Sequence, residues 1–291
     1  MAEASSPLSP ALPPALPLVG AAIQLKDLKQ VDGLHAFIRD ESRDLEIQDY
    51  SLPHVIAGDL APVIARSREA VDGHHGRIGI HGPFFGWSLA TNDADVRAIV
   101  RKRLMSALDA LLAFVPDPAK AHMVVHSPIG TWAYFNDPKD PGAAEKKIER
   151  THAALRDVLA KAADHGLTLV LENIEDRDPA ALVKMVETID HPALALSLDT
   201  GHANYAHGAL GGPPPDYFAR AFGRRLAHVH LQDTDGYADR HWQLGTGSIC
   251  WRAVMEAIAE AADAPRLLIE MRQARDILPS VRYLQELGLV R

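Results

Sequence analysis

The feature that most constrains the fold of this chain is a short apolar run, rich in Val, Ile and Leu, that recurs eight times. The runs are residues 19–25, 44–50, 77–83, 122–128, 167–173, 194–200, 226–232 and 266–272. Longer segments with apolar residues at three- and four-residue spacing separate them, among them 93–114, 143–165, 179–189 and 251–262. This alternation is typical of βαβ units, and it predicts a parallel sheet.

The number of repeats selects one architecture for that sheet. Consecutive right-handed βα units, eight in number, close into a barrel of about 250 residues. The chain has 291 residues, so it has room for one such barrel after a short lead-in. We therefore predict an α/β fold, a single (β/α)8 TIM barrel over residues 19–291. Residues 1–18 contain five prolines and are predicted to form a flexible tail without a function of its own.

Composition excludes several classes of protein. The net charge of −8 argues against a general nucleic-acid binder. The longest apolar runs are shorter than the ~20 residues that a membrane span needs. The single cysteine, Cys250, excludes an intramolecular disulfide framework and a cysteine-based zinc cluster. We expect a cytoplasmic protein without a membrane partner, and a homo-oligomer is left open.

Acidic residues and histidines stand near the carboxyl ends of six of the eight runs. They are His81, His126, Glu172, Asp199, His230 and Glu270. In a barrel these strand ends converge on one face, where active sites of this fold are built. The six positions are therefore predicted to form a single cluster.

Two loop motifs add to this cluster. D-T-G-H contributes His202 close to Asp199, and D-R-H contributes Asp239 and His241. Imidazole nitrogens and carboxylate oxygens are the ligands that zinc, manganese and related ions prefer. Because several converging carboxylates repel one another unless a cation lies among them, the sequence predicts a divalent metal cofactor: Mn, Zn, Co or Mg.

Four segments resemble a known family in order and approximate spacing. LENIEDRDP, LSLDTGHANYAHG, HVHLQDTDGYADRHWQLGTGSICW and LLIEMR are similar to segments of the xylose-isomerase-like TIM barrels. That family includes sugar phosphate isomerases and epimerases and the endonuclease IV group. For the single-metal isomerases and epimerases, the resemblance implies one ion held by Glu172, Asp199, His230 and Glu270. It also implies that Glu172 and Glu270 are the catalytic acid and base.

The endonuclease IV group implies a larger metal centre of three zinc ions and nine ligands. The resemblance provides a counterpart for each ligand: His81, His126, Glu172, Asp199, His202, His230, Asp239, His241 and Glu270. Three divalent ions among four carboxylates would leave a net charge of +2, which suits an anionic phosphoester. One ion among three carboxylates would leave −1, which suits a neutral sugar. One to three ions per chain thus remain open.

The function predicted first is isomerisation or epimerisation of a small sugar or sugar phosphate through a metal-stabilised enediolate. The alternatives are a multinuclear metal-dependent phosphoester hydrolase resembling endonuclease IV and a sugar dehydratase. The expected partner is a small carbohydrate. A nucleic-acid substrate is disfavoured by the charge of −8 and by the lack of obvious basic loops.

Other residues near the cluster are candidates for contacts with substrate. Arg240 and Arg272 carry guanidinium groups that bind carboxylates or phosphates, although a salt bridge at the barrel rim is an equal alternative. Trp87 follows His81 in an aromatic loop and is a candidate wall of the pocket. One of Glu46, Gln48 and Asp49, at the end of the second run, is expected to touch substrate, and His228 is expected to be an interior histidine.

Overall fold

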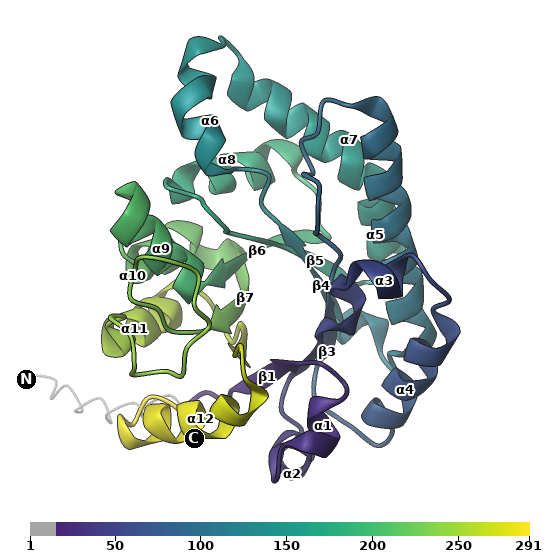
Figure 1. Ribbon diagram of the computed structural model, residues 1–291, viewed down its shortest axis with the longest axis vertical. Helices are drawn as coiled ribbons and strands as arrows, with labels where there is room; N and C mark the ends of the chain where they lie inside the picture. Colours follow the sequence, from purple (N-terminus) through teal and green to yellow (C-terminus); the bar gives the residue numbers. More distant parts are fainter. Residues whose placement is uncertain (1–15) are drawn as a thin grey trace, which may run out of the picture.

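A closed barrel of eight parallel strands forms the centre of the molecule. The computed structural model describes residues 16–291, so most of the predicted tail lies outside the described residues. Each strand pairs with the next one along the chain, and β8 pairs with β1 (Figure 1). The strands are β1 Gly20–Ile23, β2 Leu45–Ile47, β3 Ile78–His81, β4 His122–His126, β5 Thr168–Glu172, β6 Leu194–Asp199, β7 Leu226–Leu231 and β8 Arg266–Glu270. Every strand lies inside a predicted run, which confirms the (β/α)8 barrel.

Helices surround the barrel on its outside (Figure 1). The α-helices are α1 Asp27–Gln30, α2 Leu34–Asp40, α3 Pro53–Ile56, α4 Ala61–Val71, α5 Ala94–Phe114, α6 Thr131–Asn136, α7 Ala143–Asp164, α8 Pro179–Ile189, α9 Thr200–Leu210, α10 Pro215–Phe222, α11 Trp251–Ala261 and α12 Ile277–Glu286. Single turns of 3₁₀ helix are η1 Gln48–Ser51, η2 Pro118–Lys120, η3 Asp137–Lys139, η4 Gly223–Arg225 and η5 Ala274–Asp276. Helix α8 has the predicted bounds, because the Asp178 side chain accepts from the Ala180 amide and Pro179 occupies the first turn.

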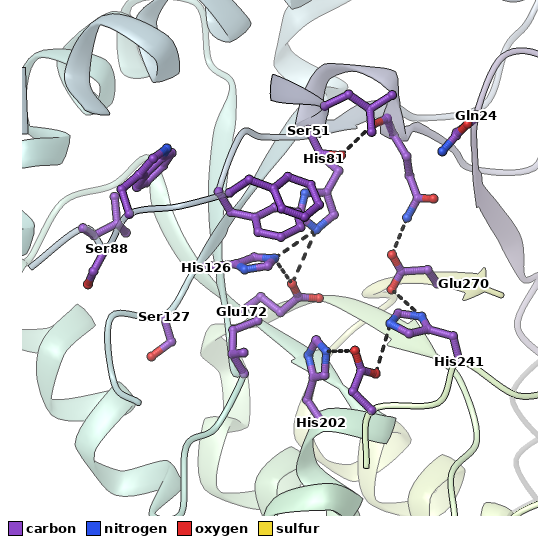
Figure 2. A pocket seen from close by; sticks show the side chains of 18 residues that line it. Gln24, Ser51, His81, Ser88, His126, Ser127, Glu172, His202, His241 and Glu270 are labelled. Carbon is purple, nitrogen blue, oxygen red and sulfur yellow. Dashed lines mark hydrogen bonds and ion pairs between the residues drawn. The ribbon is translucent and has the colours of Figure 1, made fainter. Parts of the chain in front are cut away.

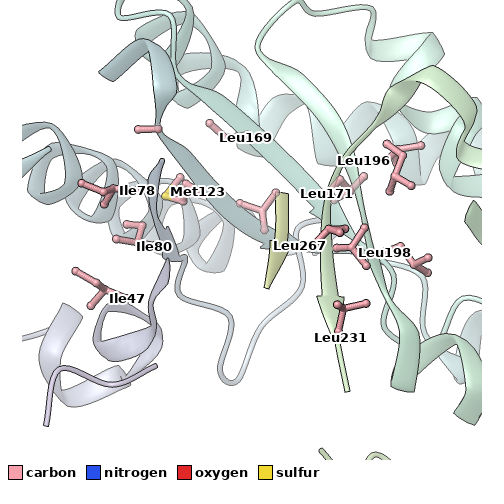
Figure 3. Packing of buried hydrophobic residues seen from close by; sticks show 14 of the residues in the cluster. Ile47, Ile78, Ile80, Met123, Leu169, Leu171, Leu196, Leu198, Leu231 and Leu267 are labelled. Atoms are coloured by element: carbon pink, nitrogen blue, oxygen red, sulfur yellow. The ribbon is translucent and has the colours of Figure 1, made fainter. Parts of the chain in front are cut away.

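The apolar core lies between the strands and the helices. Outward-facing side chains of the strands pack there, as Figure 3 shows for Ile47, Ile78, Ile80, Met123, Leu169, Leu171, Leu196, Leu198, Leu231 and Leu267. Successive residues of a strand point to opposite faces, so the alternate residues point into the barrel. Several of these are buried and polar, namely Glu46, His122, Ser197, His228 and Arg266. Outward packing against helices therefore supplies most of the apolar core, and the interior carries polar groups.

Strand register determines which side chains meet at the carboxyl end of the barrel. His126 pairs with Glu172 across β4 and β5, and Asp199 pairs with His230 across β6 and β7. Closure of the barrel sets Glu270 beside Ala22 of β1. Candidate ligands from different parts of the sequence thus become neighbours at one rim. No helix within residues 16–291 is long and apolar enough to span a membrane.

Candidate metal centre

A cavity of about 530 Å³ opens at the carboxyl ends of the strands (Figure 2). Most of the predicted metal ligands line it, namely His81, His126, Glu172, His202, Asp239, His241 and Glu270. The aromatic loop after β3 forms an apolar wall with Phe84, Phe85 and Trp87. The cavity therefore combines a polar floor with one apolar side.

The central group of ligand atoms belongs to Glu172, Asp199, His230 and Glu270. One donor atom from each lies within 4.8 Å of the others, and all four residues are buried. His230 Nδ1 is 2.5 Å from Glu172 Oε1 and 3.2 Å from Glu270 Oε2. The four ligands implied by the resemblance to single-metal isomerases thus converge on one point.

A second group joins the central one through Glu172. It consists of His81, His126 and the other oxygen of that glutamate. Glu172 Oε2 lies 3.3 Å from His126 Nε2 and 3.7 Å from His81 Nε2, and the two imidazole nitrogens are 3.2 Å apart. Dashed lines in Figure 2 mark the contacts among these three side chains. Phe84 stacks on the His126 ring with centroids 3.9 Å apart, which holds that ring in place.

A third group lies on the opposite side of the cavity. His202 Nε2 is 3.6 Å from Asp239 Oδ2, and His241 Nε2 is 3.1 Å from Asp239 Oδ1. His241 Nδ1 lies 3.6 Å from Glu270 Oε2, which connects this group to the central one. All nine predicted ligands therefore fall into three contiguous groups.

The D-T-G-H motif forms the first turn of α9. Asp199 is the N-cap residue, and its Oδ1 accepts from the His202 amide at 2.7 Å. The cap orients the carboxylate and places His202 one helical turn away on the same side. Gly201 is required because a Cβ atom would lie 2.1 Å from the buried Gln232 side chain.

Gln232 connects two candidate-ligand carboxylates that come from different parts of the chain. Its Nε2 donates to Asp199 Oδ1 and to Asp239 Oδ1, both at 3.1 Å. Its Oε1 accepts from the His241 amide at 2.9 Å, where the backbone has φ +50°. A non-glycine residue in this conformation requires support from its surroundings, and Gln232 provides it.

Hydrogen bonds to backbone carbonyls orient two of the imidazoles. His81 Nδ1 lies 2.9 Å from Gly82 O, and His202 Nδ1 lies 3.0 Å from Asn173 O. A carbonyl oxygen only accepts, so Nδ1 carries the proton in both rings. The Nε2 atom of each ring is then the nitrogen that is available to bind a metal ion from the cavity.

Burial and mutual charge perturb the ionisation of the central group. Burial alone would raise the pKa of Glu172, yet the neighbouring histidines hold this pKa well below its ordinary value. Burial, assisted by the charges of Glu172 and Glu270, raises the pKa of Asp199 to about 6. Burial opposes the charge on His230, but the carboxylates of Glu270, Glu46 and Glu172 raise its pKa well above the ordinary value. When no cation is bound, protons held by His230 and Asp199 therefore balance the negative charge of the buried carboxylates.

The donor set fits a divalent cation. Glu172 Oε2 is buried and makes no hydrogen bond, although two imidazole nitrogens face it. An unpartnered buried carboxylate oxygen is costly unless a cation compensates it. This mixture of nitrogen and oxygen donors suits zinc, manganese or cobalt better than it suits an ion that prefers oxygen ligands alone.

Comparison with known proteins places the chain in a family. The sequence matches the xylose isomerase-like TIM barrel over residues 31–287. The chain belongs to this family. Family members share the barrel, and the match does not by itself select one reaction.

Three solved structures illustrate the likeness within the xylose isomerase-like family. A D-tagatose 3-epimerase-like protein is 22% identical, with a TM-score of 0.72 over 94% of this chain and 97% of that one. A Thermus thermophilus protein whose crystal was soaked with ZnCl₂ is 25% identical, with a TM-score of 0.68 over 94% and 99%. The 3-keto-D-glucoside 4-epimerase from E. coli is 17% identical, with a TM-score of 0.65 over 92% and 98%.

The three predicted substrate-binding residues of this xylose isomerase-like barrel occupy different places. Trp87 lines the cavity. The Arg240 guanidinium pairs with Asp235 at 3.0 Å and lies over the Trp242 ring at 5.2 Å, and Arg272 Nε donates to Arg240 O. Neither arginine lines the cavity, so the salt bridge at the rim describes Arg240, and substrate binding by either arginine stays a prediction.

Four further residues contact the candidate ligands or lie beneath them. Gln232 was not singled out, because an amide after a strand carries no pattern of its own. Gln48, one of three candidates at the end of β2, donates through Nε2 to Glu270 Oε1. Asn173 exchanges hydrogen bonds with the backbone of Asp199. The buried Glu46 does not line the cavity and lies beneath the central group.

Proposed function

We propose that the chain is a divalent-metal-dependent isomerase or epimerase of a small sugar. The observation that carries this proposal is the convergence of Glu172, Asp199, His230 and Glu270 within 4.8 Å at the floor of the cavity. The two glutamates come from β5 and β8, which are not neighbours in the barrel. They therefore approach a bound sugar from separate directions.

The proposed reaction depends on proton transfer by the two glutamates. A divalent cation held by the central group would supply the charge that acidifies a C–H bond between a carbonyl and a hydroxyl carbon. Either Glu172 or Glu270 removes that proton as general base. Return of a proton from the opposite glutamate inverts the carbon, and return to the neighbouring carbon exchanges aldose and ketose. Gln48, which donates to Glu270, holds that carboxylate in place.

The lining of the cavity favours a neutral sugar over a sugar phosphate. Within the described part of the chain, no lysine or arginine lines it. Hydroxyl and amide groups do, from Gln24, Gln48, Ser51, Ser88 and Ser127. These groups suit hydroxyls, and the ring of Phe84 suits an apolar sugar face. The likeness to a D-tagatose 3-epimerase-like protein and to a 3-keto-D-glucoside 4-epimerase supports the same class of substrate.

Proton exchange with solvent tests this proposal directly. The metal-loaded protein is incubated with a panel of ketoses and aldoses in D₂O, and NMR follows deuterium at the carbon next to the carbonyl. We expect exchange in the wild type, and Glu270→Gln should slow it by about 10²–10⁴-fold while metal is retained. Glu175→Gln, at a rim carboxylate outside the cavity lining, is the matched control. Undiminished exchange in Glu270→Gln would refute the catalytic role.

The two flanking groups favour a second candidate, a multinuclear phosphoester hydrolase. His81 with His126, and His202 with Asp239 and His241, each provide donors for an additional ion. Two or three ions stabilise both the attacking and the leaving oxygen of a phosphoester. Metal per chain, measured by plasma mass spectrometry, distinguishes the two candidates. One ion supports the isomerase or epimerase, and two to three ions with cleavage of bis(p-nitrophenyl) phosphate support the hydrolase.

A further inference from the structure

A buried carboxylate lies inside the barrel beneath the cavity. Glu46 on β2 is fully buried and contacts three histidines. Its Oε1 is 3.0 Å from His230 Nε2, and its Oε2 is 2.8 Å from His122 Nε2 and 3.1 Å from His228 Nε2. Strands β4 and β7, which carry these histidines, are not neighbours of β2, so the contacts cross the barrel interior.

A missing side chain makes one of these contacts possible. Glu46, Gly79 and His122 are register partners on β2, β3 and β4. A Cβ atom on Gly79 would lie 2.0 Å from His122 Cε1, so the imidazole occupies the space that a side chain would fill. Only glycine at this position lets His122 reach across β3 to the carboxylate. The sequence is thus adapted to bring donors to Glu46.

The hydrogen-bond pattern defines the proton positions around Glu46. An ionised carboxylate only accepts, so each of the three Nε2 atoms donates to it. His228 Nδ1 is then free to accept from Ser197 Oγ, which lies 2.7 Å away. Because His230 uses its Nε2 proton for Glu46, Nδ1 is the nitrogen that faces the central group, 2.5 Å from Glu172 Oε1. In the metal-free protein Nδ1 donates to that carboxylate, and a bound ion would take the place of this proton.

His230 differs in this respect from the two imidazoles that backbone carbonyls orient. His81 and His202 hold their Nδ1 protons against carbonyl oxygens and present Nε2. His230 has the reverse arrangement, and its partner is a charged side chain within the barrel. A carboxylate accepts more strongly than a carbonyl, so it orients the ring and also increases the basicity of the ligand nitrogen.

We propose that Glu46 is a positioning residue that makes His230 an Nδ1 ligand of the central ion, and that His122 and His228 hold Glu46 for this purpose. The inference rests on the metal centre of the proposed function and is independent of the sugar reaction. A neutral amide cannot replace the carboxylate. Glutamine has one accepting oxygen and a donating NH₂ group, so at least one of the three imidazoles must lose its bond or move its proton.

Metal affinity and the Co²⁺ spectrum test this proposal. Wild type, Glu46→Gln and Tyr50→Phe are prepared metal-free, and Zn²⁺ and Co²⁺ are titrated in competition with a chromophoric chelator. Tyr50→Phe is the matched control, because it also removes a buried hydrogen bond, the one to Ser67 Oγ, but lies outside the metal groups. We expect Glu46→Gln to weaken the central ion by about 10–100-fold and to shift its visible Co²⁺ bands. Tyr50→Phe should leave both readouts unchanged.

Each other outcome has a defined meaning. Equal affinity and an unchanged Co²⁺ spectrum in Glu46→Gln overturn the proposal. Loss of one whole ion from the stoichiometry, with the remaining affinities unchanged, also overturns it, because Glu46 would then be a ligand itself. If circular dichroism shows that Glu46→Gln is unfolded, Glu46→Asp is measured instead. The aspartate carboxylate is one methylene shorter and is drawn back from His230 Nε2, so the same criteria apply to it. Glu46 effects without any sugar exchange would refute the proposed function and leave the positioning role intact.

Discussion

Asp176 is predicted to make the protein less stable as the pH rises through neutrality. Its carboxyl group is fully buried, and this burial raises its pKa from 3.8 to about 7. The folded state therefore holds a proton that the unfolded state releases, so the contribution of Asp176 to the free energy of unfolding is greatest below pH 4 and falls until the pH exceeds about 7. Over the whole titration Asp176 lowers the free energy of unfolding by about 4 kcal/mol. Roughly 2–3 kcal/mol of this loss occurs between pH 5 and 8.

The substitution Asp176→Asn should remove this dependence. Asp176 Oδ2 accepts from the Ile174 amide and Oδ1 accepts from Ser127 Oγ, both at 2.8 Å. Asparagine preserves this geometry, because its oxygen accepts from Ile174 and its NH₂ group donates to the serine oxygen. The asparagine side chain thus imitates the protonated carboxyl group and does not ionise.

Urea unfolding of the metal-free proteins from pH 5 to 8 measures the effect. The stability of Asp176→Asn relative to wild type should increase by roughly 2–3 kcal/mol across this range. Asp140→Asn is the control, because Asp140 is exposed. The difference in stability between this variant and wild type should stay constant across the pH range. A constant difference between Asp176→Asn and wild type would refute the assignment of a raised pKa to Asp176.

Three further predictions concern the metal, the barrel interior and the cavity wall. Removal of the metal by chelator should lower the melting temperature, because an ion at 1,000 times its Kd stabilises the fold by about 4 kcal/mol; an unchanged melt would contradict a tightly bound ion. Gly79→Ala should cost about 2–5 kcal/mol in urea unfolding, because the new methyl group displaces His122 from Glu46, and a cost below about 1 kcal/mol would contradict that packing. Phe84→Ala should raise the KM for the sugar about tenfold, with a smaller change in kcat, in steady-state kinetics. A large fall in kcat with little change in KM would contradict this and would mean that Phe84 stabilises the transition state instead.

The barrel was predictable because local sequence determines its parts. Strands buried on both faces read as apolar runs, and each run contains the strand that forms. The fold also predicted where the candidate ligands would meet, since eight strand ends converge on one rim. D-T-G-H was informative for a local reason as well, because an N-cap aspartate and a residue one turn later share a side of the helix.

Contacts across the barrel were not predictable in the same way. Glu46 meets histidines on β4 and β7, and nothing in the order of residues along the chain specifies which strands face each other at that depth. Gln232 joins Asp199 to Asp239 only because a loop after β7 folds back over α9. Residue type made Arg240 a candidate for substrate binding. In the structure its guanidinium group is instead paired with Asp235, five residues earlier in the chain. Residue type identified the candidate ligands, and geometry alone identified the groups that hold them in place.

The polar interior of the barrel follows from the candidate metal centre above it. Strand period places His228 and His230 on the same inner side of β7, so a histidine ligand at the rim continues downward into a second polar layer. An ion-binding imidazole needs a partner for its far nitrogen, and His230 is fully buried, so that partner must come from the protein. Glu46 meets that need, and its remaining oxygen then needs donors of its own, which His122 and His228 provide. One buried ligand thus requires a chain of partners that runs through the barrel, and the outward faces of the strands must supply the apolar packing that such an interior lacks.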